Sequence, residues 1–206
     1  MSASDRALRA RNLRTLATLA AVFLLPLIIA FLTYYGTDWR PVATVNHGAL
    51  ITPVRPLPAV ALPRIDPEAH RGAAAGQAPQ PLHGQWSLVY VGAGGCEAAC
   101  RNALVLMRQT RLALNNDMTR VARVFLVSAE CCAAEFLARE HPGLTVLDAT
   151  GPEGAPLLAA FPQPQRPDTL YVVDPLGNLM MSYDAREDPR GLLEDLKKLL
   201  RLSHIG

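Results

Sequence analysis

The stretch from Trp86 to Asn115 constrains the fold of this chain more than any other part. It opens with the apolar run Trp86–Val91, passes through a glycine-rich turn and continues as a helical pattern over Glu97–Asn115. Two cysteines, Cys96 and Cys100, stand where the turn meets the helix. Free N–H groups and the helix dipole favour a thiolate at such a junction, so the pattern predicts a reactive-thiol site after a buried strand.

From about residue 84 onward, strand-like and helix-like segments alternate. The strand-like segments are short and apolar: Trp86–Val91, Val121–Val127, Leu144–Leu147 and a hairpin pair, Thr169–Val173 and Leu179–Tyr183. The helix-like segments are Glu97–Asn115, Ala129–Glu140, a short turn at Pro156–Phe161, and Asp188–Leu202. This order predicts an α/β domain whose sheet is parallel on one side and antiparallel on the other.

The N-terminal part carries an apolar run long enough to cross a bilayer. No charged residue occurs between Arg14 and Asp38, and the 23 residues between them are mostly apolar. Four arginines precede the run, which predicts a cytoplasmic N-terminus. We therefore expect a basic tail (1–14), a transmembrane helix (15–37), a proline-rich linker (38–83) and a globular domain (84–206). A cleaved signal peptide is the competing interpretation of the apolar run.

Composition excludes some classes of function. The 206 residues carry a formal charge of +2, which argues against a nucleic-acid partner. The four cysteines form two close pairs, Cys96 with Cys100 and Cys131 with Cys132. In a chain with a membrane segment, two close pairs indicate redox or metal chemistry more than a disulfide framework. Within the linker, Val45–Pro53 is a candidate short strand or arm, and its His47 is more typical of a surface histidine than of a metal ligand.

The order of elements, with a cysteine pair after the first strand, is the thioredoxin arrangement. The Cys-x-x-x-Cys segment, the strand VFLVS and the hairpin YVVDPLGN together resemble the Sco/SenC family. That family comprises membrane-anchored, thioredoxin-like copper-insertion factors for cytochrome c oxidase. The resemblance covers about residues 84–202. It implies a thioredoxin-like fold, copper as ligand and an oxidase partner.

Three positions bear on how far the resemblance extends. Sco proteins usually have a proline after the second cysteine, where this chain has Arg101. Their third copper ligand is a histidine eight residues before the hairpin Asp-Pro, and here that position is Arg166. The next residue, Pro167, resembles the proline that precedes this strand in thioredoxins, which would place it opposite the cysteines. A purely structural proline is the alternative.

The spacing of Cys96 and Cys100 leaves two chemistries open. On a regular helix their Cα atoms would lie about 6 Å apart, near the upper end of the disulfide range. Two thiolates so placed can hold Cu(I), and they can also exchange with disulfides. If Cys96 lies in the turn, both remain open, and an inert structural disulfide is the third interpretation.

Cys131 and Cys132 follow the second strand. Because the carboxyl ends of neighbouring parallel strands share one edge of the sheet, this pair is expected to approach Cys96. It would there resolve a disulfide or supply further metal ligands. Adjacent side chains point in different directions, so we do not expect both sulfurs to face the site. Small buried residues at a helix start are the simpler interpretation.

The leading hypothesis is a single-pass protein of the bacterial inner membrane with its C-terminal domain in the periplasm. It would assist cytochrome c oxidase assembly by binding copper through Cys96 and Cys100, or by reducing cysteines of oxidase subunits or another periplasmic redox partner. The alternatives are a general membrane-tethered thiol–disulfide oxidoreductase and a non-catalytic assembly scaffold.

Overall fold

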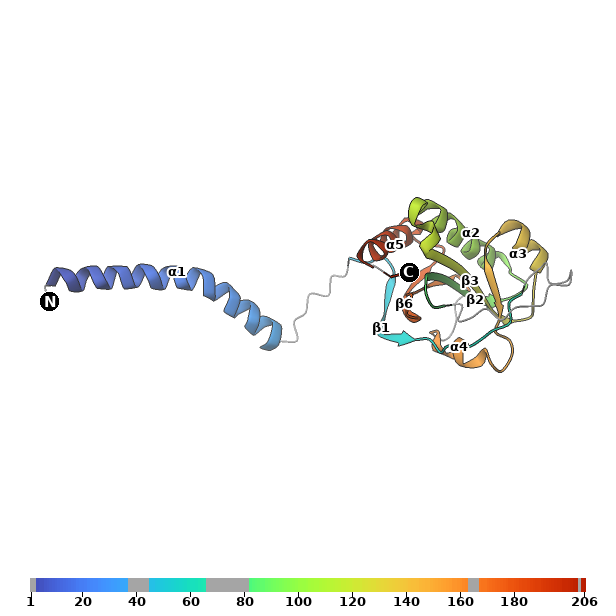
Figure 1. Ribbon diagram of the computed structural model, residues 1–206, viewed down its shortest axis with the longest axis horizontal. Coiled ribbons are helices and arrows are strands. Elements are labelled where there is room, and N and C mark those ends of the chain that lie inside the picture. The colour runs from blue at the N-terminus through green and yellow to red at the C-terminus, as the bar shows by residue number, and fades with distance from the viewer. Residues whose placement is uncertain (1–2, 37–44, 66–81, 163–166, 204) are drawn as a thin grey trace. The chain divides into compact units, whose positions relative to one another are not determined.

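A six-stranded sheet organises the C-terminal part of the chain in this computed structural model, with strand order β1-β6-β5-β2-β3-β4 (Figure 1). The strands are β1 (Ala49–Pro56), β2 (Trp86–Ala93), β3 (Val121–Ala129), β4 (Thr145–Asp148), β5 (Thr169–Val173) and β6 (Asn178–Asp184). β2, β3 and β4 are parallel, whereas β5, β6 and β1 each join the sheet through antiparallel pairs. The predicted α/β sheet, parallel on one side and antiparallel on the other, is confirmed.

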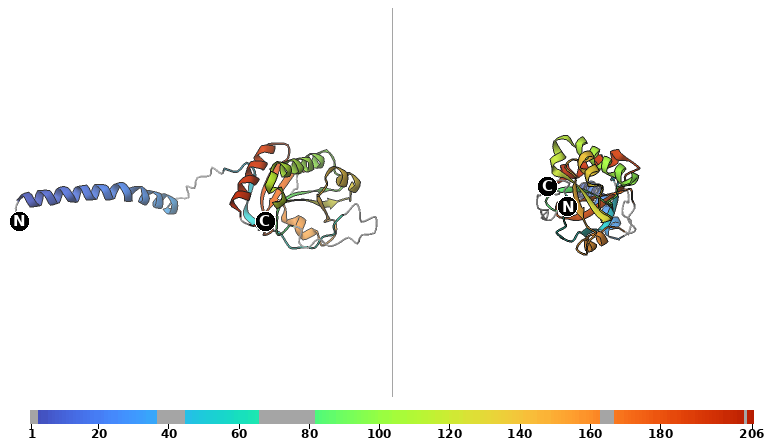
Figure 2. Two further views of the ribbon diagram at one scale, coloured as in Figure 1. Left: turned by 45° about the horizontal axis from the view of Figure 1, so that its top comes forward. Right: turned by 90° about the vertical axis from the view of Figure 1, so that its right-hand side faces the viewer.

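Helices cover both faces of the sheet. They are α2 (Ala98–Ala113), the 3₁₀ helix η2 (Asn115–Arg120), α3 (Ala134–Glu140), α4 (Ala155–Ala160) and α5 (Pro189–Leu202). Figures 1 and 2 show α2 and α5 side by side over one face, with α4 on the opposite side. The antiparallel hairpin and α5 complete the thioredoxin-like order expected from the sequence.

The alternating residues of β2 divide the core into two layers. Leu88 and Tyr90 pack in a cluster with Met107 of α2, whereas Val89 and Val91 belong to a second cluster on the other face. All four β2 residues are at most 3% exposed. Both faces of a central strand are covered in this way, which explains why β2 reads as one continuous apolar run.

The structure describes residues 3–36, 45–65, 82–162, 167–203 and 205–206, and they fall into two units that divide after Val45. The first unit contains α1 (Ala3–Gly36), which begins upstream of the apolar run. Within it, Arg11–Gly36 is long and apolar enough to cross a membrane, with a mean hydropathy of 2.5. Pro26 lies inside this helix, where membrane helices tolerate proline.

Two elements differ from the sequence-based expectation. The arm expected at Val45–Pro53 is a strand at Ala49–Pro56, and the second unit begins at Asn46, upstream of the expected start near residue 84. β1 pairs with the outer edge of β6, which would otherwise present unpaired backbone groups. The helix expected from Ala129 begins only at Ala134.

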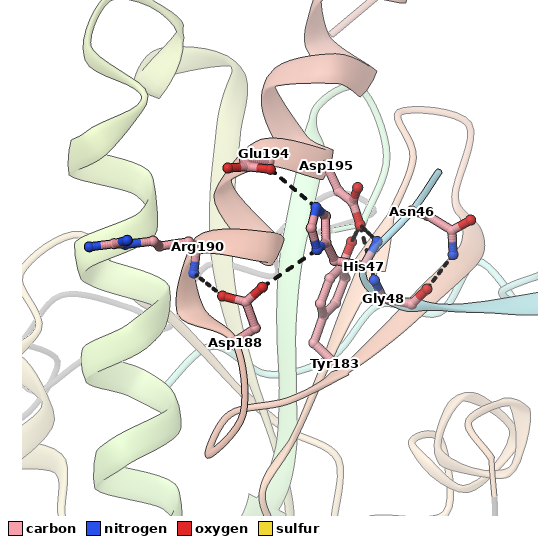
Figure 3. Close-up of polar contacts among 8 residues, drawn as sticks. All are labelled: Asn46, His47, Gly48, Tyr183, Asp188, Arg190, Glu194 and Asp195. Carbon is pink, nitrogen blue, oxygen red and sulfur yellow. Dashed lines mark hydrogen bonds and ion pairs between the residues drawn. The ribbon is translucent and has the colours of Figure 1, made fainter. Parts of the chain in front are cut away.

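A buried carboxylate fastens the start of this unit to α5. Oδ2 of Asp195 accepts hydrogen bonds from the backbone N–H of His47 (2.8 Å), from that of Gly48 (3.0 Å) and from the hydroxyl of Tyr183 (2.8 Å) (Figure 3). Burial, and then the bond to Asp195, raise the pKa of Tyr183. A Cβ at position 48 would overlap the Tyr183 ring, so glycine permits this close approach. Since Asp195 is 4% exposed, its bonds are shielded from water.

Replacing Asp195 by alanine should destabilise this unit by about 2–3 kcal/mol, because three donors would lose their acceptor in a buried site. The measurement is urea unfolding of the full chain in mild detergent, followed by the fluorescence of buried Trp86. Glu194→Ala is the matched control. Its carboxylate pairs with His47 at 3.1 Å but is 66% exposed, so the cost should stay below about 1 kcal/mol. Equal losses in the two variants would show that Asp195 is not the fastening group.

Candidate active site at the carboxyl edge of the sheet

Cys96 and Cys100 form a disulfide at the beginning of α2. Their Cα atoms are 5.0 Å apart, within the usual disulfide range and closer than two positions four apart on a regular helix. Cys96 lies in the turn, with φ of 46°, and Glu97 is the N-cap residue of α2. The left-handed conformation of Cys96 thus turns the chain so that its sulfur meets that of Cys100.

Arg101 holds this turn against α3. Its Nε donates to the backbone oxygen of Cys96 at 3.1 Å, and its guanidinium carbon lies 5.0 Å from the centre of the Phe136 ring. A guanidinium over an aromatic face is an attractive cation–π contact. The residue that replaces the usual Sco proline therefore connects the Cys96 turn to the helix that follows the second cysteine pair.

A cleft of about 620 Å³ opens beside the disulfide. Its wall includes Tyr90, Cys96, Cys100, Ser128, Glu130 and Pro167. The Tyr90 hydroxyl donates to the backbone oxygen of Pro167 at 2.9 Å. Burial, and then the charge of Asp168, raise the pKa of Tyr90 to about 12, so this hydroxyl keeps its proton at neutral pH. Pro167 lines the same cleft as Cys96 and Cys100, whereas Arg166 falls outside the described residues.

Cys131 and Cys132 form a second disulfide, with each other. They occupy the turn between β3 and α3, where Glu130 has a φ of 35°. This turn is the reason why α3 starts later than expected. Cys131 is exposed and Cys132 is half-buried, so the simpler interpretation of two small buried residues is wrong for Cys131.

The predicted metal ligands fit copper only in part. Both cysteine pairs are oxidised, and a disulfide offers no thiolate to a metal. Among the residues that the structure describes, no three His, Cys, Asp or Glu side chains gather into a metal-binding group. His47 instead contacts α5, with Nδ1 3.5 Å from Asp188 and Nε2 3.1 Å from Glu194, and it does not line the cysteine cleft (Figure 3).

The sequence-based prediction named Cys96, Cys100 and Pro167, which the structure places around one cleft, but it did not anticipate two other features of this neighbourhood. In the sequence, Tyr90 is one more position in the apolar run of β2. In the structure its ring packs over Gly92, which has no side chain to block it. The Arg101–Phe136 contact joins two helices and leaves no local pattern. A buried tyrosine beside a glycine at a strand end was the available signal.

Solved structures of similar fold include several Sco proteins. Apo Sco1 from Thermus thermophilus is 16% identical, with a TM-score of 0.54 over 77% of this chain and 99% of that one. Copper-bound yeast Sco1 is 15% identical, with a TM-score of 0.56 over 71% and 95%. A putative thioredoxin from Neisseria meningitidis is 14% identical, with a TM-score of 0.53 over 73% and 93%. At identities this low, the structural similarity shows a shared fold and nothing more specific.

Comparison with curated proteins found no relative of the chain. A family model described as "Transmembrane-like, thioredoxin-like, C-terminal domain" matches residues 86–203, which is more than half of the 206 residues. The match spans β2 to α5 and so includes both disulfides and the cleft. The chain therefore belongs to this transmembrane-like, thioredoxin-like family, and its domain has the fold of the Sco proteins.

Proposed function

We propose that this chain performs thiol–disulfide exchange through Cys96 and Cys100 during cytochrome c oxidase assembly, as a membrane-anchored protein with its domain in the periplasm. The observation that carries the proposal is the Cys96–Cys100 disulfide on the wall of the cleft at the start of α2. The Sco resemblance supports the oxidase as the destination. The arginines before the apolar part of α1 support a cytoplasmic N-terminus.

The reaction runs between the reduced cysteine pair and a disulfide of the partner. The Cys96 thiolate attacks one partner sulfur, the partner disulfide breaks, and its second sulfur leaves as a thiolate. Cys100 then attacks Cys96, which restores the internal disulfide and releases the partner as a dithiol. The start of α2 and the guanidinium of Arg101 favour negative charge on Cys96 while it attacks.

Copper handling is the second candidate. Two sulfurs that approach closely enough to bond to each other can, once reduced, hold Cu(I) between them, and Sco proteins of the same fold are known with copper bound. In this role copper is cargo. The described residues offer no third ligand beside the two sulfurs, which favours exchange over copper as the primary chemistry.

Trapping identifies the attacking sulfur. In the Cys131→Ser/Cys132→Ser background, adding Cys100→Ser should accumulate a mixed disulfide between Cys96 and a disulfide-containing peptide, because the resolving thiol is absent. The matched variant Cys96→Ser in the same background should accumulate about tenfold less, because Cys96 precedes the N-terminus of α2, where the helix dipole favours a thiolate, whereas Cys100 lies within the first turn of the helix. The measurement is non-reducing electrophoresis with peptide mass spectrometry on the full chain in mild detergent. Equal trapping in both would assign no attacking role to Cys96.

Copper binding is measured by titrating the reduced full chain with Cu(I) against a chromophoric chelator. If copper is cargo, one equivalent should bind, and Cys96→Ser should abolish it, because a single thiolate holds Cu(I) weakly. The Cys131→Ser/Cys132→Ser chain is the control and should bind normally. Copper binding that persists in the Cys96→Ser chain would show that these two cysteines are not the copper site.

The role in assembly is tested in cells that lack the native gene. The Cys96→Ser/Cys100→Ser chain should leave oxidase activity as low as in the deletion strain, because both proposed chemistries need these sulfurs. The Glu194→Ala chain, which changes an exposed residue outside the cleft, serves as a control for expression. Full oxidase activity with the double variant would leave only a scaffold role.

A further inference from the structure

The turn that carries the second disulfide begins beside the turn that carries the first, at the same edge of the sheet. β2 and β3 are neighbouring parallel strands, and Ala93 at the end of β2 pairs with Ala129 at the end of β3. Cys96 comes three residues after Ala93, and Cys132 comes three residues after Ala129. Since neighbouring strands lie about 4.8 Å apart, the two cysteine turns start side by side.

Gly94 holds these two turns together. Its N–H donates to the oxygen of Ala129 at 2.8 Å, and its own oxygen accepts from the N–H of Ala133 at 2.9 Å. A Cβ at position 94 would lie 3.1 Å from Sγ of Cys132. The Cys132 sulfur therefore packs against the backbone of the turn that leads into Cys96, two residues further on.

The two pairs differ in how accessible they are. Cys96 is 1% exposed and Cys100 is 4% exposed, and both belong to the buried cluster under α2. Cys132 packs against that same cluster, whereas Cys131 is exposed. The second pair therefore has one exposed residue and one that packs against the cluster to which the first pair belongs.

We propose that Cys131 and Cys132 form the electron-entry site of this protein. The pair accepts two electrons from an external protein dithiol and passes them to the Cys96–Cys100 disulfide. This proposal rests on the proposed exchange function, because it supplies the reduced pair that exchange consumes. The two disulfides then have separate roles: Cys131–Cys132 meets the electron donor, and Cys96–Cys100 in the cleft reduces the partner protein.

Each step exchanges one disulfide for another. A donor thiolate attacks Cys131, the Cys131–Cys132 bond breaks, and Cys132 leaves as a thiolate; the second donor thiol then frees Cys131, and the donor becomes a disulfide. Next, Cys132 attacks Cys96, and Cys100 leaves as a thiolate. Finally, Cys131 attacks Cys132, the vicinal disulfide forms again, and Cys96 is released. The net change moves two electrons and two protons from the donor dithiol to Cys96 and Cys100.

The bridging intermediate is tested by trapping inside the full chain in mild detergent. The Cys100→Ser/Cys131→Ser variant keeps Cys96 and Cys132, and oxidised glutathione should join them in an intramolecular disulfide that peptide mapping detects. The matched Cys100→Ser/Cys132→Ser variant keeps Cys96 and the solvent-facing Cys131, and it should form about tenfold less of the link, because only Cys132 is held against the Cys96 turn. Absence of a Cys96–Cys132 link, or equal linkage in both variants, would overturn the proposal.

Electron entry is tested by kinetics. With reduced thioredoxin as the donor, the Cys96–Cys100 disulfide should be reduced at least about tenfold more slowly in the Cys131→Ser/Cys132→Ser chain than in the native chain, since the intramolecular route has a high effective concentration. Differential alkylation and mass spectrometry follow each pair. Dithiothreitol is small enough to enter the cleft and should reduce both chains at similar rates, which controls for damage to the site. Equal rates with thioredoxin would overturn the proposal.

Failure of this proposal can be separated from failure of the exchange function. If thioredoxin reduces both chains equally and Cys96 still traps the peptide, electron entry through Cys131 and Cys132 is wrong and exchange at Cys96 stands. If the Cys96–Cys132 link forms and the thioredoxin rate falls, but Cys96 traps no peptide, the relay is supported and the proposed exchange with partners fails.

Discussion

The parallel pairing of β2 with β3 is the constraint on which the candidate site depends. The register that places Ala93 beside Ala129 brings two otherwise separate turns to one edge of the sheet. Both strands are buried on their two faces, so a slip by one residue would turn core side chains toward the wrong layer. The packing of the core therefore also determines where the four sulfurs lie. In this protein the stability of the sheet and the placement of the two cysteine pairs have the same physical origin.

Most of the fold could be predicted because the strands and helices differ clearly in apolar periodicity. The limits of β5 were predicted without error, and α5 was displaced by a single residue at its start, since Asp188 caps it and accepts from the N–H of Arg190. β1 was harder to predict, because its residues are mostly exposed and include two prolines. It is a strand because β6 offers a free edge and because Asp195 fastens the preceding residues. Neither cause is visible in the local sequence.

In the candidate site, too, features set by the local sequence could be predicted, whereas features set by distant residues could not. Cys96 and Cys100 follow a glycine-rich turn, and that local pattern was enough to find them. The bond between Cys131 and Cys132 was not predicted, because two adjacent residues can pair only when the backbone around them leaves regular structure. Here Glu130 adopts a positive φ and Ala133 bonds back to Gly94. Such a turn is set by the neighbouring strand and glycine, which lie 35 or more residues earlier in the chain.

Arg101, at the position where Sco proteins usually have a proline, links the two cysteine turns. A proline after the second cysteine has no side chain that can reach another element, whereas Arg101 bonds to the oxygen of Cys96 and lies over Phe136 of α3. It therefore ties the turn of the first cysteine pair to the helix that follows the second pair. Gly94 makes the same connection through the backbone on the other side of these turns. Arg101 and Gly94 thus hold the turns of the two disulfides in one rigid neighbourhood. Thiol–disulfide exchange benefits from that rigidity, because the attacking sulfur must be held close to, and aligned with, the disulfide that it breaks.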